Sequence, residues 1–113
     1  MTQAPQWASV ANDTKWNELR EAVLTMPKTP AFRCKDLNGH YTSPDTEWFY
    51  HFRDGGLETT RWVDLIVDDA QARSEVAGHL NRIGLAGHET DEGFRVFGYI
   101  EHGQPIDYFG ARA

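Results

Sequence analysis

Three tight-turn signals constrain the fold of this chain more than any other feature. They are Asn38-Gly39, Asp54-Gly55-Gly56 and His102-Gly103, and each stands between short segments in which apolar and polar residues alternate. Glycine readily adopts the positive φ angles that two-residue hairpin turns need, and alternation with a period of two is typical of strands. We therefore expect three hairpins. Their paired segments are 31–37 with 40–43, 47–52 with 57–67, and 94–100 with 105–109.

The segment 13–26 shows the spacing of an amphipathic helix instead. Asp13 or Thr14 can accept hydrogen bonds from the first free amides, and Pro27 ends the pattern. The apolar residues recur three or four positions apart, at Trp16, Leu19, Val23 and Met26.

A second helix is expected over 68–84. Asp68 or Asp69 can cap its start, and Gly84 suits its end. Its apolar face consists of Ala72, Val76, Leu80 and Ile83.

The predicted order is helix, three or four strands, helix, two strands. Strands that follow one another through tight turns are antiparallel neighbours, so we expect an α+β fold: an antiparallel sheet of about five or six strands with two helices packed mainly on one face. A chain of 113 residues can bury one core. Residues 1–12 lack periodicity and are expected to be a flexible N-terminal arm, in which Trp7 could dock locally, before a single domain at 13–113.

Composition argues against several classes of protein. Seventeen acidic residues against eleven Lys and Arg give a net charge of −6, whereas nucleic-acid binders need a basic face. Cys34 is the only cysteine, so an internal disulfide cannot form and a cytoplasmic protein is expected. The first residues have no secretory-leader pattern, and no stretch approaches the ~18 apolar residues that span a bilayer. We expect neither secretion nor a membrane partner.

No catalytic or metal-binding motif stands out. The candidate ligands are scattered without a recognised spacing: Cys34, His40, His51, His79, His88 and His102. No serine has the setting of a catalytic nucleophile, and a lone cysteine such as Cys34 is usually a small buried hydrophobe. The sequence therefore predicts a non-enzymatic protein without cofactor or metal.

The second predicted hairpin separates its side chains into two faces. A two-residue turn at Gly55-Gly56 would place Trp48, Tyr50 and Phe52 in the core. On the other face it would pair Phe49 with Trp62, Glu47 with Asp64, and His51 with Thr60.

Two interpretations of that second face remain open. Aromatic rings rimmed by acids would suit a protein partner with basic residues. Alternatively, the rings pack beneath the first helix or the N-terminal arm, with the acids in solvent. The candidate partner-binding residues are Glu47, Phe49, His51, Trp62 and Asp64, together with Asp91 and Glu92 from a later acidic loop.

Four segments resemble a family of small bacterial proteins known only as a domain of unknown function. They are TKWNELREAV (14–23), EWFYHF (47–52), RWVDL (61–65) and GFRVFGYIEHGQPIDYF (93–109). The resemblance implies a compact, soluble bacterial domain and brings no established activity. Small acidic α+β proteins of this kind also look like the immunity proteins of polymorphic toxin systems.

We therefore expect a protein-binding domain, and specifically an immunity protein that neutralises a bacterial toxin through an acidic, aromatic surface. The alternative is a small-molecule-binding or enzymatic domain with a pocket between the sheet and the second helix, using His51, Asp64 or Asp107. A homodimer is a third expectation.

Overall fold

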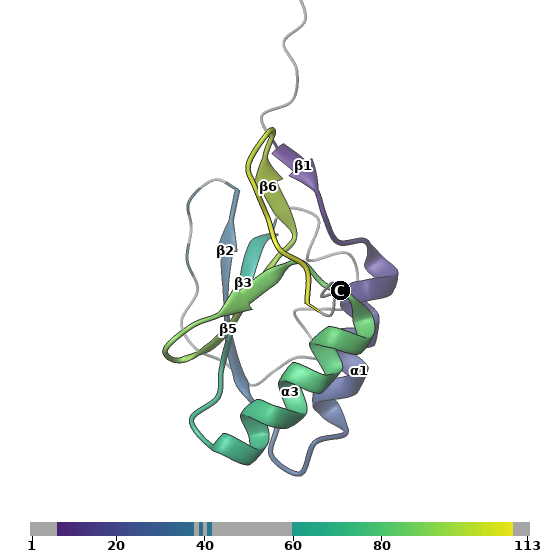
Figure 1. Ribbon diagram of the computed structural model, residues 1–113, viewed down its shortest axis with the longest axis vertical. Coiled ribbons are helices and arrows are strands. Elements are labelled where there is room, and N and C mark those ends of the chain that lie inside the picture. Colours follow the sequence, from purple (N-terminus) through teal and green to yellow (C-terminus); the bar gives the residue numbers. More distant parts are fainter. Residues whose placement is uncertain (1–6, 38, 40, 42–59, 110–113) are drawn as a thin grey trace, which may run out of the picture.

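The fold is given by a computed structural model that describes residues 7–37, 39, 41 and 60–109. In these residues the elements are, in chain order (Figure 1), β1 (Trp7–Ser9), α1 (Asp13–Leu24), β2 (Ala31–Asp36), β3 (Thr60–Ile66), α3 (Ala70–Ile83), β4 (Gly87–Glu89), β5 (Gly93–Phe97) and β6 (Tyr99–Glu101). The strands form two antiparallel sheets, one of four strands in the order β2-β3-β5-β4 and one of two strands, β1-β6. The α+β fold is confirmed, with its strands divided between two sheets.

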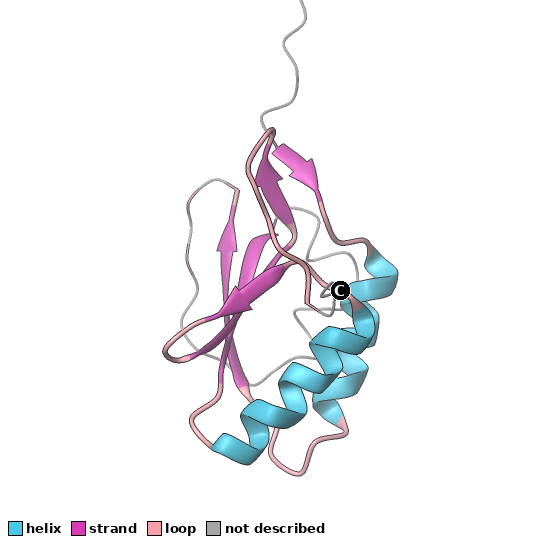
Figure 2. Ribbon diagram, viewed as in Figure 1, coloured by secondary structure: helices cyan, strands magenta, loops and turns pink. Residues whose placement is uncertain are grey.

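Both helices lie against one face of the four-stranded sheet (Figure 2). Alternate residues of β3, Val63 and Leu65, are fully buried beneath them, as expected for a strand with one covered face. The helices contribute Leu19 and Val23 from α1 and Leu80 from α3, all with no exposed surface. The expected packing of the helices on one face is confirmed.

Helix α1 has a different N-cap from the two residues that the sequence suggested. Asn12 is the N-cap: its backbone is extended and its side-chain Oδ1 accepts a hydrogen bond from the amide of Lys15 at 2.9 Å. Asp13 and Thr14 are already inside the helix, so the expected caps are wrong. All three residue types can cap, and only the backbone conformation decides between neighbours.

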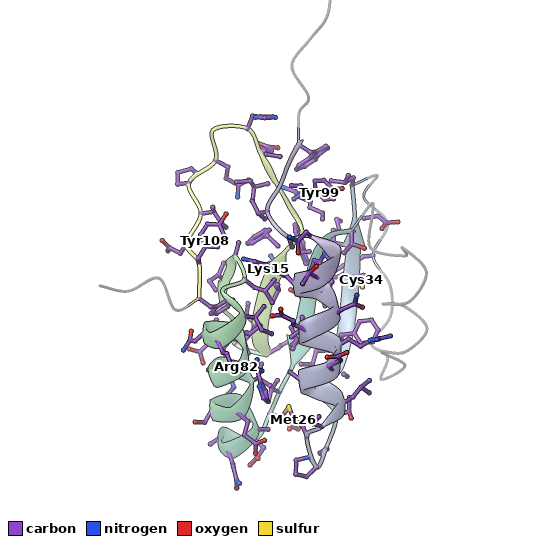
Figure 3. All side chains as sticks on the ribbon, turned by 90° about the vertical axis from the view of Figure 1, so that its right-hand side faces the viewer. Lys15, Met26, Cys34, Arg82, Tyr99 and Tyr108 are labelled. Carbon is purple, nitrogen blue, oxygen red and sulfur yellow. The ribbon has the colours of Figure 1, made fainter. Side chains whose placement is uncertain are left out.

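Helix α3 has the ends that the sequence indicated. Asp69 is its N-cap and accepts from the amide of Ala72 at 3.1 Å, and Gly84 ends the helix in the left-handed conformation with φ 79°. The ammonium of Lys15 donates to the carbonyl of Gly84 at 3.0 Å, which joins the start of α1 to the end of α3. Figure 3 shows Lys15 between the two helices.

The first predicted turn is partly described. Gly39 has φ 93°, its amide donates to the carbonyl of Asp36 at 3.0 Å, and Tyr41 forms an antiparallel bridge with Lys35. The chain therefore reverses direction where Asn38-Gly39 indicated. Residues 38, 40, 42 and 43 of this hairpin lie outside the described residues.

Strand β3 pairs with other strands than the one that the second predicted hairpin gave it. The predicted strand 47–52 and its turn 54–56 lie outside the described residues. Both edges of β3 are occupied: Trp62 pairs with Lys35 of β2 and Phe97 of β5, and Asp64 pairs with Arg33 and Arg95. The expected pairing of Trp62 with Phe49 and of Asp64 with Glu47 is therefore wrong, because a strand has only two edges.

The third predicted hairpin is half right. The chain turns at 102–103, where Gly103 has φ 83° and the amide of Gln104 donates to the carbonyl of Glu101. However, β6 pairs with β1, and 105–109 runs instead beside the start of β4, with a bridge between Ala86 and Tyr108.

Two strands were missed in segments that the sequence suggested were irregular. The polar loop before β5 contains β4, which pairs with β5 from Gly87 to Glu89. The end of the expected N-terminal arm contains β1, which pairs with β6 at one end of the molecule (Figure 1). A second, smaller core lies beneath this pair and consists of Ala86, Phe97 and Ile100, with Ala8, Val10, Trp62 and Ile106 packed against them.

Candidate functional site: the polar face of the four-stranded sheet

The sheet face opposite the helices carries a row of charged residues in register. Arg33 of β2, Asp64 of β3 and Arg95 of β5 are direct cross-strand partners, and His88 of β4 is the partner of Arg95. We call Arg33, Asp64 and Arg95 the charged row. Directly opposite residues in antiparallel strands lie close enough for their side chains to interact, so a carboxylate between two guanidinium groups is favourable.

Asp64 is the centre of this row and is almost excluded from solvent, with 9% of its side chain exposed. Arg95 binds the carboxylate in a bidentate manner: its Nε donates to Oδ1 at 2.8 Å and its Nη2 donates to Oδ2 at 3.1 Å. The hydroxyl of Tyr41 also donates to Oδ2. Two-point contacts of this kind fix geometry as well as adding energy.

The surroundings shift the ionisation of each member of this cluster. Burial alone would raise the pKa of Asp64, but hydrogen bonds from Arg95 and Tyr41, with the charges of Arg95 and Arg33, outweigh it and lower that pKa below its ordinary value. Burial raises the pKa of Tyr41, and its bond to Asp64 raises it further. The bond to Asp64 also raises the pKa of Arg95. Asp64 therefore stays ionised and Tyr41 stays a hydrogen-bond donor at neutral pH.

Tyr41 is exposed, yet its ring has contacts on several sides. Cζ of Arg33 lies 5.2 Å and Nζ of Lys35 lies 5.5 Å from the ring centroid, and Trp62 meets the ring edge-on with centroids 6.4 Å apart. The exposed fraction of Tyr41 is 39%. The residue thus presents an aromatic surface whose ring and hydroxyl are both held in place.

Trp62 lies beside the charged row, and its ring packs against the second core. Cζ of Arg95 lies 4.1 Å from its ring and Cζ of Arg61 lies 4.9 Å from it. Arg61 also lies over the ring of Trp7, at 4.6 Å, so a cation connects Trp62 to β1. Of the two interpretations left open by the sequence, packing beside the N-terminal segment is favoured for Trp62.

A hollow of about 240 Å³, which we call the charged hollow, opens over the row. Its lining residues are Arg33, Tyr41, Asp64, Leu65, Thr90, Asp91, Glu92 and Arg95. The structure thus brings together three predicted partner-binding residues, Asp64, Asp91 and Glu92. Trp62 lies next to Asp64 on the same face, and Glu47, Phe49 and His51 lie outside the described residues.

The loop that carries Asp91 and Glu92 is held by Arg73 of α3. Its Nη2 donates to the carbonyls of Thr90 and Asp91, its Nε donates to the carbonyl of Val67, and its Nη1 pairs with Glu89 at 2.5 Å. Glu92 in turn pairs with Arg33 at 3.0 Å. The loop is therefore fixed at its backbone, while both acidic side chains face solvent.

The sequence reasoning missed Arg33, Arg95 and Tyr41, which are central to this face. A signal for the first two existed: Arg33 alternates with the buried Phe32 and Cys34, and Arg95 alternates with the buried Phe94 and Val96. Their convergence on Asp64 depends on the strand order, which alternation alone does not give.

Comparison with protein families decides where the chain belongs, because residues 1–103 match one family over almost the whole length. The chain belongs to the family of unknown function DUF6678. Comparison with curated proteins and with solved structures gave no match. The family resemblance inferred from the sequence is thus confirmed as a domain of unknown function.

Among the residues that the structure describes, this DUF6678 domain does not place the candidate ligands of the sequence together, and His40 and His51 lie outside those residues. Cys34 is buried, His79 contacts Arg82, His88 contacts Phe97, and His102 lies exposed in a turn. Within residues 7–37, 39, 41 and 60–109, no three His, Cys, Asp or Glu side chains gather closely enough to hold a metal ion.

The space between the sheet and α3 is filled by core side chains. Val63, Leu65, Val76 and Leu80 meet there with no exposed surface. Asp64 points to the opposite face, so a pocket beside this helix could not use it. Neither of the described helices has the length and apolar composition needed to cross a membrane.

Proposed function

We propose that the chain is a non-enzymatic protein-binding domain and that the sheet face around Tyr41 makes the contact. One observation carries the proposal: Tyr41 is exposed while its hydroxyl is bound to Asp64 and the cations of Arg33 and Lys35 lie within 5.2 and 5.5 Å of its ring centroid. A side chain that is already ordered loses little entropy on binding. Tyrosine and arginine are also enriched among the residues that dominate binding energies.

The finer proposal is a bacterial, cytoplasmic immunity protein that covers a toxin. It rests on the likeness of class between small acidic α+β proteins and immunity proteins, and on the net charge of −6. The exposed acid Asp91 at the charged hollow supports it, because rim charges accelerate association with a basic partner, and the exposed Glu92 beside it is paired with Arg33. Asp64 adds no free charge to this surface, since Arg95 neutralises it.

Co-expression with the product of the adjacent gene tests this function. We expect a stable complex in size-exclusion chromatography with light scattering, which also separates a heteromeric complex from a homodimer. Tyr41→Ala should weaken the affinity at least about 30-fold, equivalent to about 2 kcal/mol. Leu24→Ala is the matched control, because Leu24 is an exposed apolar residue on α1, in the helical layer. The absence of any complex would remove the main support for the proposal.

A further inference from the structure

A second hollow, of about 210 Å³, lies on the same sheet face beside His88, and we call it the His88 hollow. Its lining residues are Gly87, His88, Phe97, Gln104, Pro105, Ile106 and Asp107. Phe97 is two residues along β5 from Arg95, a distance of about 7 Å in a strand. The His88 hollow therefore adjoins the charged row and belongs to the same surface as Tyr41.

Residues 104–107 form one wall of the His88 hollow, and hydrogen bonds hold this segment in place. The amide of Gly87 donates to the carbonyl of Asp107 at 3.0 Å, and the amide of Phe109 donates to the carbonyl of Leu85 at 2.8 Å. At the other end, the side-chain Oε1 of Gln104 accepts from the amide of Glu101 at 3.0 Å. The segment that forms the wall is tied at both ends, so the hollow is formed before any partner arrives.

The chemistry of the His88 hollow suits a side chain that is apolar along its length and positive at its tip. Phe97 is 7% exposed, and the ring of His88 lies against it with centroids 5.9 Å apart. Pro105 and Ile106 add apolar surface, and Asp107 supplies a carboxylate. Lysine and arginine bury their methylene stems along such surfaces while their charged heads reach a carboxylate or an aromatic face.

The two hollows differ in the cations of their lining. The charged hollow includes Arg33 and Arg95, which pair with Glu92 and Asp64 and lie near Asp91, whereas the lining of the His88 hollow includes no lysine or arginine. In the described part of the chain Asp107 forms no ion pair, and it is exposed. A carboxylate without a counter-ion in an acidic protein attracts a cation and repels an anion.

We propose that the His88 hollow receives a single lysine or arginine side chain from the protein partner. The inference rests on the proposed protein-binding function and names the chemistry of one contact. Pockets for drug-sized ligands have volumes of roughly 300–1,000 Å³, so a volume near 210 Å³ suits one side chain better than a whole ligand. Asp107 meets the cationic head, and Phe97 and His88 contact the stem.

An NMR titration of the protein alone tests the preference of the hollow. The probe is N-acetyl-arginine methylamide, and the control probe is the citrulline analogue, which has nearly the same shape without the charge. We expect the arginine probe to shift the amide signals of His88, Gln104 and Asp107 with a Kd of about 1–10 mM, as befits one side chain. Asp107→Asn should weaken this binding at least fivefold, whereas Asp91→Asn, which removes an acid from the charged hollow, should not.

Three outcomes would overturn the inference: equal shifts with the citrulline probe, shifts centred on the charged row, or no shifts with either probe. A complex with the adjacent gene product separates this inference from the proposed function. If the complex forms and Asp107→Asn leaves its affinity unchanged, the His88 hollow is not the contact and the binding function stands. If no complex forms while the arginine probe binds at His88, the hollow has the proposed preference and the binding function loses its support.

Discussion

The carboxylate of Asp64 accepts hydrogen bonds from Arg95 and Tyr41 in a nearly buried position. We expect Asp64→Asn to lower the free energy of unfolding by about 2–3 kcal/mol. The substitution removes the negative charge opposite Arg95, and the side-chain NH2 of asparagine would face a group of Arg95 or Tyr41 that donates to the carboxylate. Urea unfolding at pH 7 measures this change.

Glu92→Gln provides the matched control for Asp64→Asn. It also removes a carboxylate from an arginine pair, but 61% of the Glu92 side chain is exposed. Exposed ion pairs contribute little, so the change should stay within about 0.5 kcal/mol. Equal losses for the two variants would contradict the central role of Asp64.

The lowered pKa of Asp64 also predicts a pH dependence. The unfolded chain takes up a proton at this position near pH 3.9, whereas the folded protein does so only at lower pH. The stabilisation by Asp64 is therefore complete above about pH 4 and is lost as the pH falls through the folded-state pKa. Urea unfolding between pH 7 and pH 3 should show the advantage of the wild type over Asp64→Asn shrinking on acidification. Parallel pH profiles would contradict this.

At this scale the sequence predicted some site residues and missed others. Alternation correctly put Trp62 and Asp64 on one face of β3, which is a local property of any strand. It could not show that Asp64 is neutralised, because Arg33 and Arg95 come from strands that are distant in sequence. The prediction for Asp64 was incomplete because the charge of this residue is balanced by side chains from other strands.

Among the elements, α1 offers a direct test of its N-cap, Asn12. We expect Asn12→Ala to destabilise the protein by about 1 kcal/mol, because the amide of Lys15 loses its acceptor. Thr14→Ala, inside the helix and exposed, should cost much less. Thermal unfolding by circular dichroism measures both, and a larger loss for Thr14→Ala would place the cap where the sequence alone suggested.

Strand β4, one of the two strands that the sequence did not predict, shows why turn signals are not sufficient to locate every element. β4 consists of Gly87, His88 and Glu89 and contains none of the β-branched residues typical of strands. Gly87 is needed for close approach, because a Cβ there would lie 2.0 Å from the carbonyl oxygen of Arg95. Because glycine is also common in loops, the glycine that close packing requires at position 87 made this strand look like a loop in the sequence. In contrast, Gly84 and Gly103 end or turn the chain as their positions indicated.

For the whole molecule, the β1-β6 sheet gives the clearest prediction. Removing residues 1–9 deletes β1 and uncovers the second core, so we expect a loss of about 2 kcal/mol in the free energy of unfolding. Removing residues 1–6 leaves β1 in place and is the control. Urea unfolding followed by tryptophan fluorescence compares the two proteins. Equal stability of the two truncated chains would show that β1 contributes nothing.

The fold class was predictable, and the division into two sheets was not. Helical periods, tight turns and alternating segments are local patterns, and together they indicate antiparallel α+β architecture. The pairing of Trp7 with Glu101 joins opposite ends of the described chain and leaves no local pattern in either segment. The same reason explains why the N-terminal segment looked like a loose arm.

The pairing of β1 with β6 also has a consequence during synthesis. A ribosome makes roughly 5–20 residues per second, so β1 leaves the exit tunnel on the order of ten seconds before β6 can meet it. Throughout that interval Trp7 has neither β6 nor Arg61 in its final place. A nascent chain of this protein therefore exposes the segment Trp7–Ser9 to chaperones until β6 has been made.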